Sequence, residues 1–204
     1  AIAVLFAASL HYLNGYGWPE AAQHGLLLGA SAQSTTGFAS LQISDLDPTA
    51  KLLLMLAMFT GGGVGSTAGG IKLLRMLIIF HMLRFLVARS AMPEHALVFP
   101  RLAGRKIGAL DFQRAALTVV LFLLATVASC LVFLVYGHDP MNALFEVVSA
   151  VGTVGLSTGI TSPDLDPFLK FVLCLNMLMG RLEILALLVI LYPPTWFGRR
   201  AAGL

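Results

Sequence analysis

Two stretches of the chain share one pattern of apolar and polar positions, and they lie about 118 residues apart. In each stretch a short apolar segment ends at a Thr-x-Gly-apolar turn, a polar loop follows, and a long apolar segment begins after Asp-Leu-Asp-Pro. The first copy covers residues 31–48 and the second covers residues 149–167, with one extra residue, Pro163, in the second loop. An internal repeat of this kind predicts a duplicated structural unit.

The lengths of the apolar segments separate re-entrant helices from spanning helices. Residues 19–38 predict a pore helix of about 24 Å followed by a turn, which is too short to cross a hydrocarbon core of ~30 Å. Residues 140–157 predict a second pore helix and turn in the same way. Longer apolar runs at residues 113–136 and 167–192 predict spanning helices, and residues 1–13 predict the end of a truncated first helix.

The third apolar stretch, residues 48–89, contains a glycine-rich interruption. The part from Lys51 to Arg89 would measure about 58 Å as one helix, nearly twice the ~30 Å core of a membrane. Residues 61–70 contain six glycines in ten positions, and each costs a helix about 1 kcal/mol relative to alanine. We therefore expect a broken helix, whose irregular backbone is tolerated inside a membrane only where protein or water surrounds it.

The composition is that of an all-α integral membrane protein. Hydrophobic residues make up 58% of the chain and charged residues only 11%, with a mean hydropathy of +0.87. The net charge of +3 gives no reason to expect a nucleic-acid partner. Basic residues concentrate around residues 90–112 and near the C-terminus, whereas the aspartate-containing loops lie on the other side. The positive-inside rule makes the basic side cytoplasmic. We expect a multi-pass protein of the plasma (inner) membrane, with Ser90–Phe112 and the C-terminus in the cytoplasm.

Both Thr-x-Gly turns follow a short helix whose C-terminus carries partial negative charge, so a cation is favoured in front of it. Glycine permits the backbone angles that turn consecutive carbonyl groups inward to replace the hydration shell of a cation. The candidate ion-binding residues are Thr35, Thr36, Gly37, Phe38, Thr153, Val154, Gly155 and Leu156. Taken alone, either sequence is equally consistent with an ordinary turn that binds no ion. Two turns form half of a ring, so we expect two more units and the missing N-terminal half in a longer protein.

The motifs together resemble the TrkH/KtrB superfamily of potassium uptake proteins, and TrkH more closely. The motifs are Thr35-Thr36-Gly37-Phe38, Gly65–Lys72, Thr153–Ser157 and Gly180-Arg181-Leu182-Glu183. The resemblance covers essentially the whole chain as the third and fourth of four pore repeats, at residues 1–89 and 113–204, joined by a linker at residues 90–112. It implies a pseudo-four-fold pore with K⁺ at the carbonyls of Thr35, Thr36, Gly37, Thr153, Val154 and Gly155, an intramembrane gating loop, a homodimer and a cytoplasmic nucleotide-binding ring of the TrkA type. Each turn has one glycine rather than the Gly-Tyr-Gly of a potassium channel, so we expect weaker selectivity for potassium. Whether sodium is also carried is left open by the sequence.

Arg181 aligns with Gly62 in the repeat, which places it deep in the membrane. An arginine there costs ~2.5–3.5 kcal/mol, so it needs acceptors or water. The broken helix supplies free carbonyl groups at the same depth, which predicts a gate formed by Gly61, Gly62, Gly63, Gly65, Ser66, Thr67, Gly69 and Gly70 together with Arg181. The alternative is that Arg181 only connects helices. We interpret His24 and Glu146, on the two short helices, as packing or capping groups rather than ligands.

We expect a potassium uptake pore that is driven by the membrane potential and gated from the cytoplasm. A secondary carrier that couples potassium to sodium or protons also uses broken helices near the midplane and is the main alternative, and a non-transporting membrane scaffold is a third. The sequence shows no nucleophile with a general base and no metal-ligand spacing, and Cys130 and Cys174 lie within apolar helices. We therefore predict no enzymatic activity and no cofactor.

Overall fold

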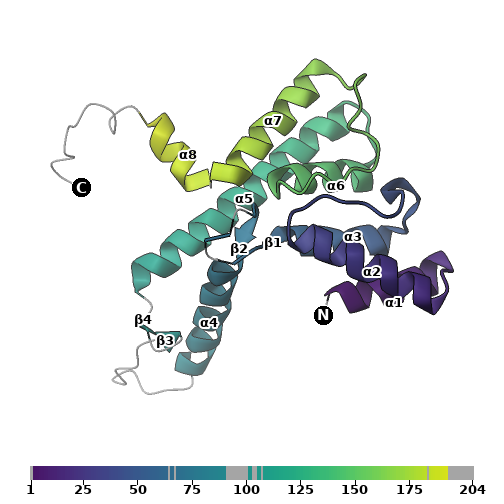
Figure 1. The fold of residues 1–204 in the computed structure, drawn as a ribbon. Coiled ribbons are helices and arrows are strands. Elements are labelled where there is room, and N and C mark those ends of the chain that lie inside the picture. Colours follow the sequence, from purple (N-terminus) through teal and green to yellow (C-terminus); the bar gives the residue numbers. More distant parts are fainter. Residues whose placement is uncertain are drawn as a thin grey trace.

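The computed structural model describes residues 2–63, 65–66, 68–90, 101–102, 105–106, 108–182 and 184–192, and most of them are helical. The helices are α1 (Ile2–Asn14), α2 (Trp18–Gln33), α3 (Pro48–Phe59), α4 (Leu73–Ser90), α5 (Ala109–Val135), α6 (Pro140–Val151), α7 (Pro167–Leu182) and α8 (Ile184–Leu191) (Figure 1). A 3₁₀ turn, Ile43–Asp45, precedes α3. Two short strand pairs complete the described structure: parallel β1 (Thr60–Gly61) with β2 (Ile71–Lys72), and antiparallel β3 (Arg101–Leu102) with β4 (Arg105–Lys106).

The helices form two groups that meet at α6. In Figure 1, α1, α2 and α3 lie together, while α5, α6 and α7 form the neighbouring group. The apolar core of the first group also takes in Phe145 and Val148 of α6, whereas Val147 and Val151 of the same helix belong to the core of the second group. The short helix α6 is therefore buried between the two groups, and eight of its twelve residues are buried.

Helix α5 has the length and apolarity of a membrane-spanning helix. The most apolar 18 residues within Leu110–Val135 have a mean hydropathy of 2.8, and only 28% of them are buried within the protein. A helix that is apolar on nearly all sides and only partly covered by protein is suited to lipid. The helix begins at Ala109, four residues before the predicted start at residue 113. Asp111 in its first turn accepts a hydrogen bond from the Gly108 amide at 3.2 Å, which favours this earlier start.

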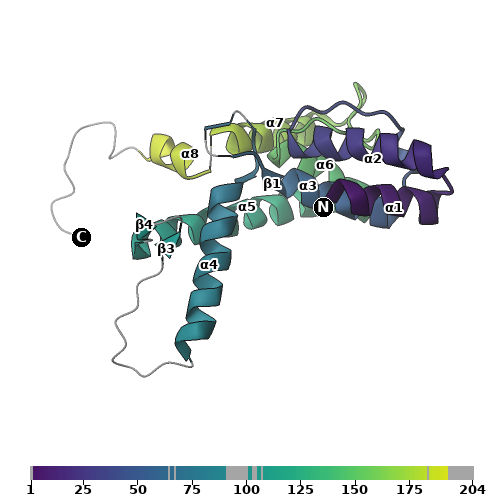
Figure 2. The same cartoon turned by 60° about the horizontal axis from the view of Figure 1, so that its bottom comes forward.

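The stretch predicted as one broken helix is interrupted after Phe59 and resumes at Leu73. On either side of the interruption Thr60 pairs with Ile71 and Gly61 with Lys72 in a parallel arrangement. Figure 2 shows α4 leaving the layer of the other helices at a steep angle. The glycine-rich segment therefore forms a closed loop whose two ends lie side by side, and the sequence pattern did not predict that strand pairing.

The prediction of one continuous helix over residues 167–192 is wrong. Helix α7 ends at Leu182, and α8, which begins at Ile184, is inclined to it by 103°. Gly180 lies within one turn of the break and lowers the local helix propensity by about 1 kcal/mol relative to alanine. The bend leaves a straight segment of sixteen residues, or about 24 Å, in place of a helix longer than a membrane core.

The two Asp-Leu-Asp-Pro loops fold in the same way. The carboxylates of Asp47 and Asp166 cap the helices that follow, each accepting a backbone amide hydrogen bond of 2.8 Å. A lysine in the first turn of each helix then reaches back seven residues to a loop carbonyl, from Lys51 to Ser44 and from Lys170 to Pro163. Lys51 also donates to Asn142 Oδ1 at 2.9 Å, which joins the first loop to α6.

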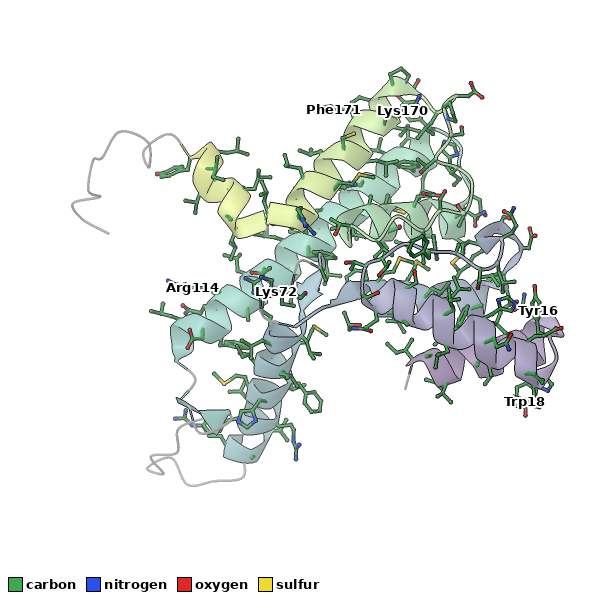
Figure 3. All side chains as sticks on the ribbon, viewed as in Figure 1. Tyr16, Trp18, Lys72, Arg114, Lys170 and Phe171 are labelled. Atoms are coloured by element: carbon green, nitrogen blue, oxygen red, sulfur yellow. The ribbon has the colours of Figure 1, made fainter. Side chains whose placement is uncertain are left out.

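The polar loops lie at one end of the described structure. Figure 3 shows Tyr16 and Trp18 at the corner between α1 and α2, Lys170 and Phe171 at the start of α7, and Arg114 toward the opposite end. His11 stacks on Trp18 with ring centroids 4.2 Å apart, and Tyr12 meets the same ring edge-on. Aromatic side chains gathered at a helix corner are typical of a membrane interface.

Replacing Lys51 with methionine tests the connection between the two groups of helices. Lys51 is only 6% exposed, so its loss leaves Asn142 Oδ1 and the Ser44 carbonyl without this donor in a partly buried region. We expect a loss of about 1–3 kcal/mol of stability, measured as a lower thermal denaturation midpoint of the full-length protein in detergent. The matched control is Lys170→Met, which removes a single bond within one loop and should lower the midpoint less. Equal shifts of the thermal midpoint in the two variants would contradict the role of Lys51 in connecting the two groups of helices.

Candidate functional site

The two Thr-x-Gly turns have the same backbone geometry. Each short helix ends in a residue with helical angles, Ser34 or Gly152, which is followed by a threonine with a positive φ, 55° at Thr35 and 54° at Thr153. Two residues later a glycine also has a positive φ, 80° at Gly37 and 91° at Gly155. The matching sequence patterns therefore fold into matching turns.

The same backbone hydrogen bonds close both helix ends. The amide of Thr36 donates to the Ser31 carbonyl at 3.0 Å, and the amide of Val154 donates to the Ser149 carbonyl at 2.9 Å. In each turn the preceding threonine amide donates three residues back along the helix. This pair of bonds is the Schellman arrangement, which satisfies the last helix carbonyls and normally places glycine where these turns have threonine.

Left-handed backbone angles at a β-branched residue are unfavourable by about 1–3 kcal/mol, and such residues concentrate at functional sites. Both turns carry this feature at equivalent positions, Thr35 and Thr153. The Thr153 hydroxyl oxygen is buried, and within the described part of the chain it has no hydrogen-bond partner. The strained threonine is repeated in both turns, and at Thr153 the unused buried oxygen indicates that the side chain has a purpose beyond closing the helix.

The two turns lie directly against each other. A methyl group added at Gly37 would overlap the carbonyl oxygen of Val154, so only glycine allows this approach. The side chains of Val154 and Leu156 are buried, at 4% and 2% exposed, and pack into the core of the first group of helices. In the first turn the equivalent Phe38 is 72% exposed. One side of the paired turns is thus covered by protein, and the other side is open.

The glycine-rich segment lies beneath both turns. Below the first turn, Gln33 at the end of α2 donates to the Thr60 carbonyl at 2.6 Å and accepts from the Thr60 hydroxyl at 3.2 Å. Below the second turn, Gly69 approaches the Thr153 side chain and the Gly152 carbonyl so closely that an added methyl group would overlap both. The segment therefore touches the ends of both short helices.

Two hydrogen bonds lie inside this segment among its described residues. The amide of Ser66 donates to the Gly63 carbonyl at 3.1 Å, and the Ser66 hydroxyl accepts from the Ala68 amide at 3.2 Å. Gly63 and Gly65 have no neighbour within van der Waals distance of an added methyl group. Thr67, another residue of the predicted gate, lies outside the described residues. The ends of the segment are closely packed, whereas its middle around Gly63 and Gly65 is open, and sparsely packed backbone belongs to the low-stability end of a structure.

Arg181 lies close to the second turn, because the neighbouring Gly180 packs against the end of α6. A methyl group at Gly180 would overlap the Val151 carbonyl and approach the Thr153 side chain to 3.2 Å. Gly180 and Gly69 thus contact Thr153 from two different elements, so Arg181 lies at the depth of the glycine-rich segment. The Arg181 side chain itself is exposed.

Two polar connections were not anticipated from the sequence. Glu146 is buried in α6 and accepts hydrogen bonds from Ser157, Thr158 and Thr161, which follow the second turn. His24 of α2 hydrogen-bonds Ser40, which follows the first turn, at 2.9 Å. The sequence interpreted both residues as packing or capping groups; a charged residue within an apolar helix is the signal that Glu146 needs polar partners, but its position alone does not identify them.

Comparison with known proteins places the chain among cation transporters. The family model TrkH, described as a cation transport protein, matches residues 2–194. The chain is 31% identical over 175 residues to the Trk system potassium uptake protein TrkH of Escherichia coli, which covers 81% of this chain and 35% of that protein. It is 35% identical over 177 residues to the Trk system potassium uptake protein TrkI of Halomonas elongata, with the same coverage.

The fold also matches a solved structure, that of the potassium transporter TrkH from Vibrio parahaemolyticus. The TM-score is 0.81 at 26% sequence identity, and the match covers 96% of this chain and 42% of that one. The chain thus spans about a third of the length of the curated relatives.

Adding a methyl group to one glycine at a time tests the contacts beneath the turns. We expect Gly180→Ala and Gly69→Ala to destabilise the protein by about 1–3 kcal/mol, as overpacking does, because their new methyl groups meet backbone carbonyls. Gly63→Ala is the matched control and should leave the thermal midpoint of the full-length protein within about 1 °C, since the space around it is open. A midpoint for Gly180→Ala equal to that of Gly63→Ala would show that α7 does not pack on α6 in this way.

Proposed function

The chain belongs to the TrkH family of cation transport proteins, and we propose that it forms two of the four pore units of a potassium uptake protein. The observation that carries this proposal is the pair of matched turns, each at the C-terminal end of a short helix, in contact through Gly37 and Val154. Relatives that are 31% and 35% identical to this chain are named as potassium uptake proteins. The proposed pore extends that description to this chain.

The paired turns would form half of the selectivity filter. Two helix C-termini, each with roughly half a negative charge, favour a cation between them. The positive φ angles of Thr35, Gly37, Thr153 and Gly155 allow successive carbonyl groups to face a common axis. K⁺ would be bound by the carbonyls of Thr35, Thr36, Gly37, Thr153, Val154 and Gly155, with Phe38 and Leu156 completing the turns.

The open side of the first turn would be covered by another pore unit. A groove of about 600 Å³ beside α2 is lined by Leu26, Leu27, Ala30, Ser34, Thr36 and Phe38, among others. In the second turn the residue equivalent to Phe38 is Leu156, which is buried by the unit beside it. A pseudo-four-fold ring would bury Phe38 in the same way, against a unit from the remaining part of the protein.

The glycine-rich segment would be the gate. It comprises Gly61, Gly62, Gly63, Gly65, Ser66, Thr67, Gly69 and Gly70 and approaches the cytoplasmic side of both turns. Its weak internal packing allows two arrangements, one of them obstructing the pore below the filter. Arg181, at the same depth, would donate charge-assisted hydrogen bonds to the segment's carbonyls in the closed arrangement, each worth about 1.5–3 kcal/mol.

The membrane potential is a sufficient driving force for uptake. A potential of 100 mV is worth about 2.3 kcal/mol per charge, which supports roughly 40-fold accumulation of K⁺. In our proposal the protein lies in the inner (plasma) membrane with the polar loops outside and Ser90–Phe112 and the C-terminus in the cytoplasm. It would act as a homodimer under a cytoplasmic TrkA-like ring, since relatives are named as members of a Trk system.

Substitution of the filter glycines tests the pore assignment. Gly37→Ala and Gly155→Ala place a side chain where φ is 80° and 91°, which an L-residue adopts only with strain. We expect the rubidium-over-sodium uptake ratio of the full-length protein, measured in potassium-starved cells, to fall at least about tenfold, while the variants still insert. Normal ratios in both inserted variants would remove these turns from the filter.

Substitution of Arg181 tests the gate. Loss of its hydrogen bonds in Arg181→Gln should shift the closed-to-open equilibrium by about one to two decades, at ~1.4 kcal/mol per decade. Potassium uptake into liposomes without the cytoplasmic ring should therefore speed up. Arg181→Lys should be intermediate, because lysine keeps the charge and lacks the planar fork. If the Arg181→Gln protein inserts and carries potassium no faster than the parent, Arg181 is a helix-packing residue and not part of the gate.

A further inference from the structure

Glu146 is a buried carboxylate whose four hydrogen-bond donors are all neutral. Its side chain lies in the middle of α6 and is 4% exposed. One oxygen accepts from the Ser157 hydroxyl at 2.6 Å, the Thr158 amide at 2.7 Å and the Thr158 hydroxyl at 3.0 Å, and the other accepts from the Thr161 hydroxyl at 2.7 Å. The four donors equal in number the roughly four lone-pair sites of a carboxylate, and three of them converge on one oxygen.

All the donors come from the segment that leaves the second turn. Ser149, one turn further along α6, adds a fifth connection, since its hydroxyl accepts from the Gly155 amide at 3.2 Å. The path of the chain from Gly155 to Thr161 is thus determined by two side chains of the short helix behind it. Charge-assisted hydrogen bonds of this kind are shorter and stronger than neutral ones, and a satisfied network makes its surroundings rigid.

The first turn lacks this support. Leu28 occupies the position equivalent to Glu146 and is fully buried among apolar side chains. Among the described residues, the segment after the first turn has one side-chain hydrogen bond to its helix, between His24 and Ser40, and the turn itself has one between the Ser34 and Thr36 hydroxyls at 2.5 Å. The Ser31 hydroxyl oxygen, equivalent to that of Ser149, has no hydrogen-bond partner within the described residues. Two turns with the same backbone are therefore held with unequal strength.

We propose that Glu146 is a positioning residue that holds the carbonyls of the second turn on the ion path, so that cation selectivity depends more on this turn than on the first. The inference rests on the proposed function and adds that the two turns contribute unequally to selectivity. Discrimination between cations of different size requires carbonyl groups that keep their positions, and these tolerate shifts of only about 0.5 Å. The hydrogen-bond shell of Glu146 supplies that constraint next to Val154 and Gly155.

Replacing Glu146 with the residue that the first unit has at this position tests the proposal. In liposomes that contain the full-length protein, Glu146→Leu should lower the rubidium-over-sodium uptake ratio roughly tenfold, because the four donors lose their acceptor. Glu146→Gln should recover part of the ratio, since its amide oxygen can still accept where Oε1 does. Ser40→Ala, the matched control after the first turn, should change the ratio less than about twofold, because it removes one hydrogen bond.

Milder variants keep the test decisive if Glu146→Leu does not insert. Ser157→Ala and Thr161→Val each remove one donor and leave the carboxylate in place, and the double variant should lower the ratio about two- to fivefold. Unchanged ratios in these variants would overturn the proposal. A ratio that stays normal while total uptake falls would do the same, because it assigns Glu146 to folding alone.

The outcome for Gly155→Ala separates this inference from the pore assignment. If Gly155→Ala lowers the ratio and the Glu146 variants do not, the second turn belongs to the filter and Glu146 does not position it. If the ratio is normal in all of them, the pore assignment has failed as well.

Discussion

The structure depends on one constraint, which is that peptide groups inside a membrane must be satisfied by the protein or by the ion. Each short helix ends within the apolar part of the fold, so its last carbonyls would be left unpaired without a closing motif. The Schellman bonds at Thr36 and Val154 satisfy some of these groups. The left-handed threonines and glycines turn the following carbonyls away from the helix. In our proposal these carbonyls bind a potassium ion instead of water.

Close approach of backbone to backbone explains how so many irregular segments share one region. Gly37, Gly69 and Gly180 each come within the distance at which a single methyl group would overlap a carbonyl oxygen. The two Thr-x-Gly turns, the glycine-rich segment and the end of α7 can therefore meet around Thr153. Side chains with hydroxyl or carboxylate groups, including Glu146, then determine which of these backbones are held firmly. Among the described residues of the glycine-rich segment, the Ser66 hydroxyl makes one such bond, to the Ala68 amide, which is consistent with an element that moves.

The sequence alone predicts features that are local. The repeated Thr-x-Gly pattern indicates two similar turns because their geometry depends on a few neighbouring residues, and the glycines of residues 61–70 predict an interruption because they weaken any helix. Features that arise from packing were not accessible in this way. The bend between Leu182 and Ile184, the parallel pairing of Thr60 with Ile71 and the partners of Glu146 all depend on contacts between distant segments. Positive φ at Thr35 and Thr153 was also unexpected, since threonine disfavours it.

The central claim is that the two turns bind a cation through their carbonyl oxygens. Anomalous X-ray diffraction from crystals of the full-length protein, grown or soaked in rubidium or thallium salts, tests it most directly. Our account predicts anomalous density on the axis that the carbonyls of Thr35, Thr36, Gly37, Thr153, Val154 and Gly155 face, and loss of that density when sodium replaces the heavier ion. Ordered turns without such density, with the ion bound elsewhere in the protein, would contradict it.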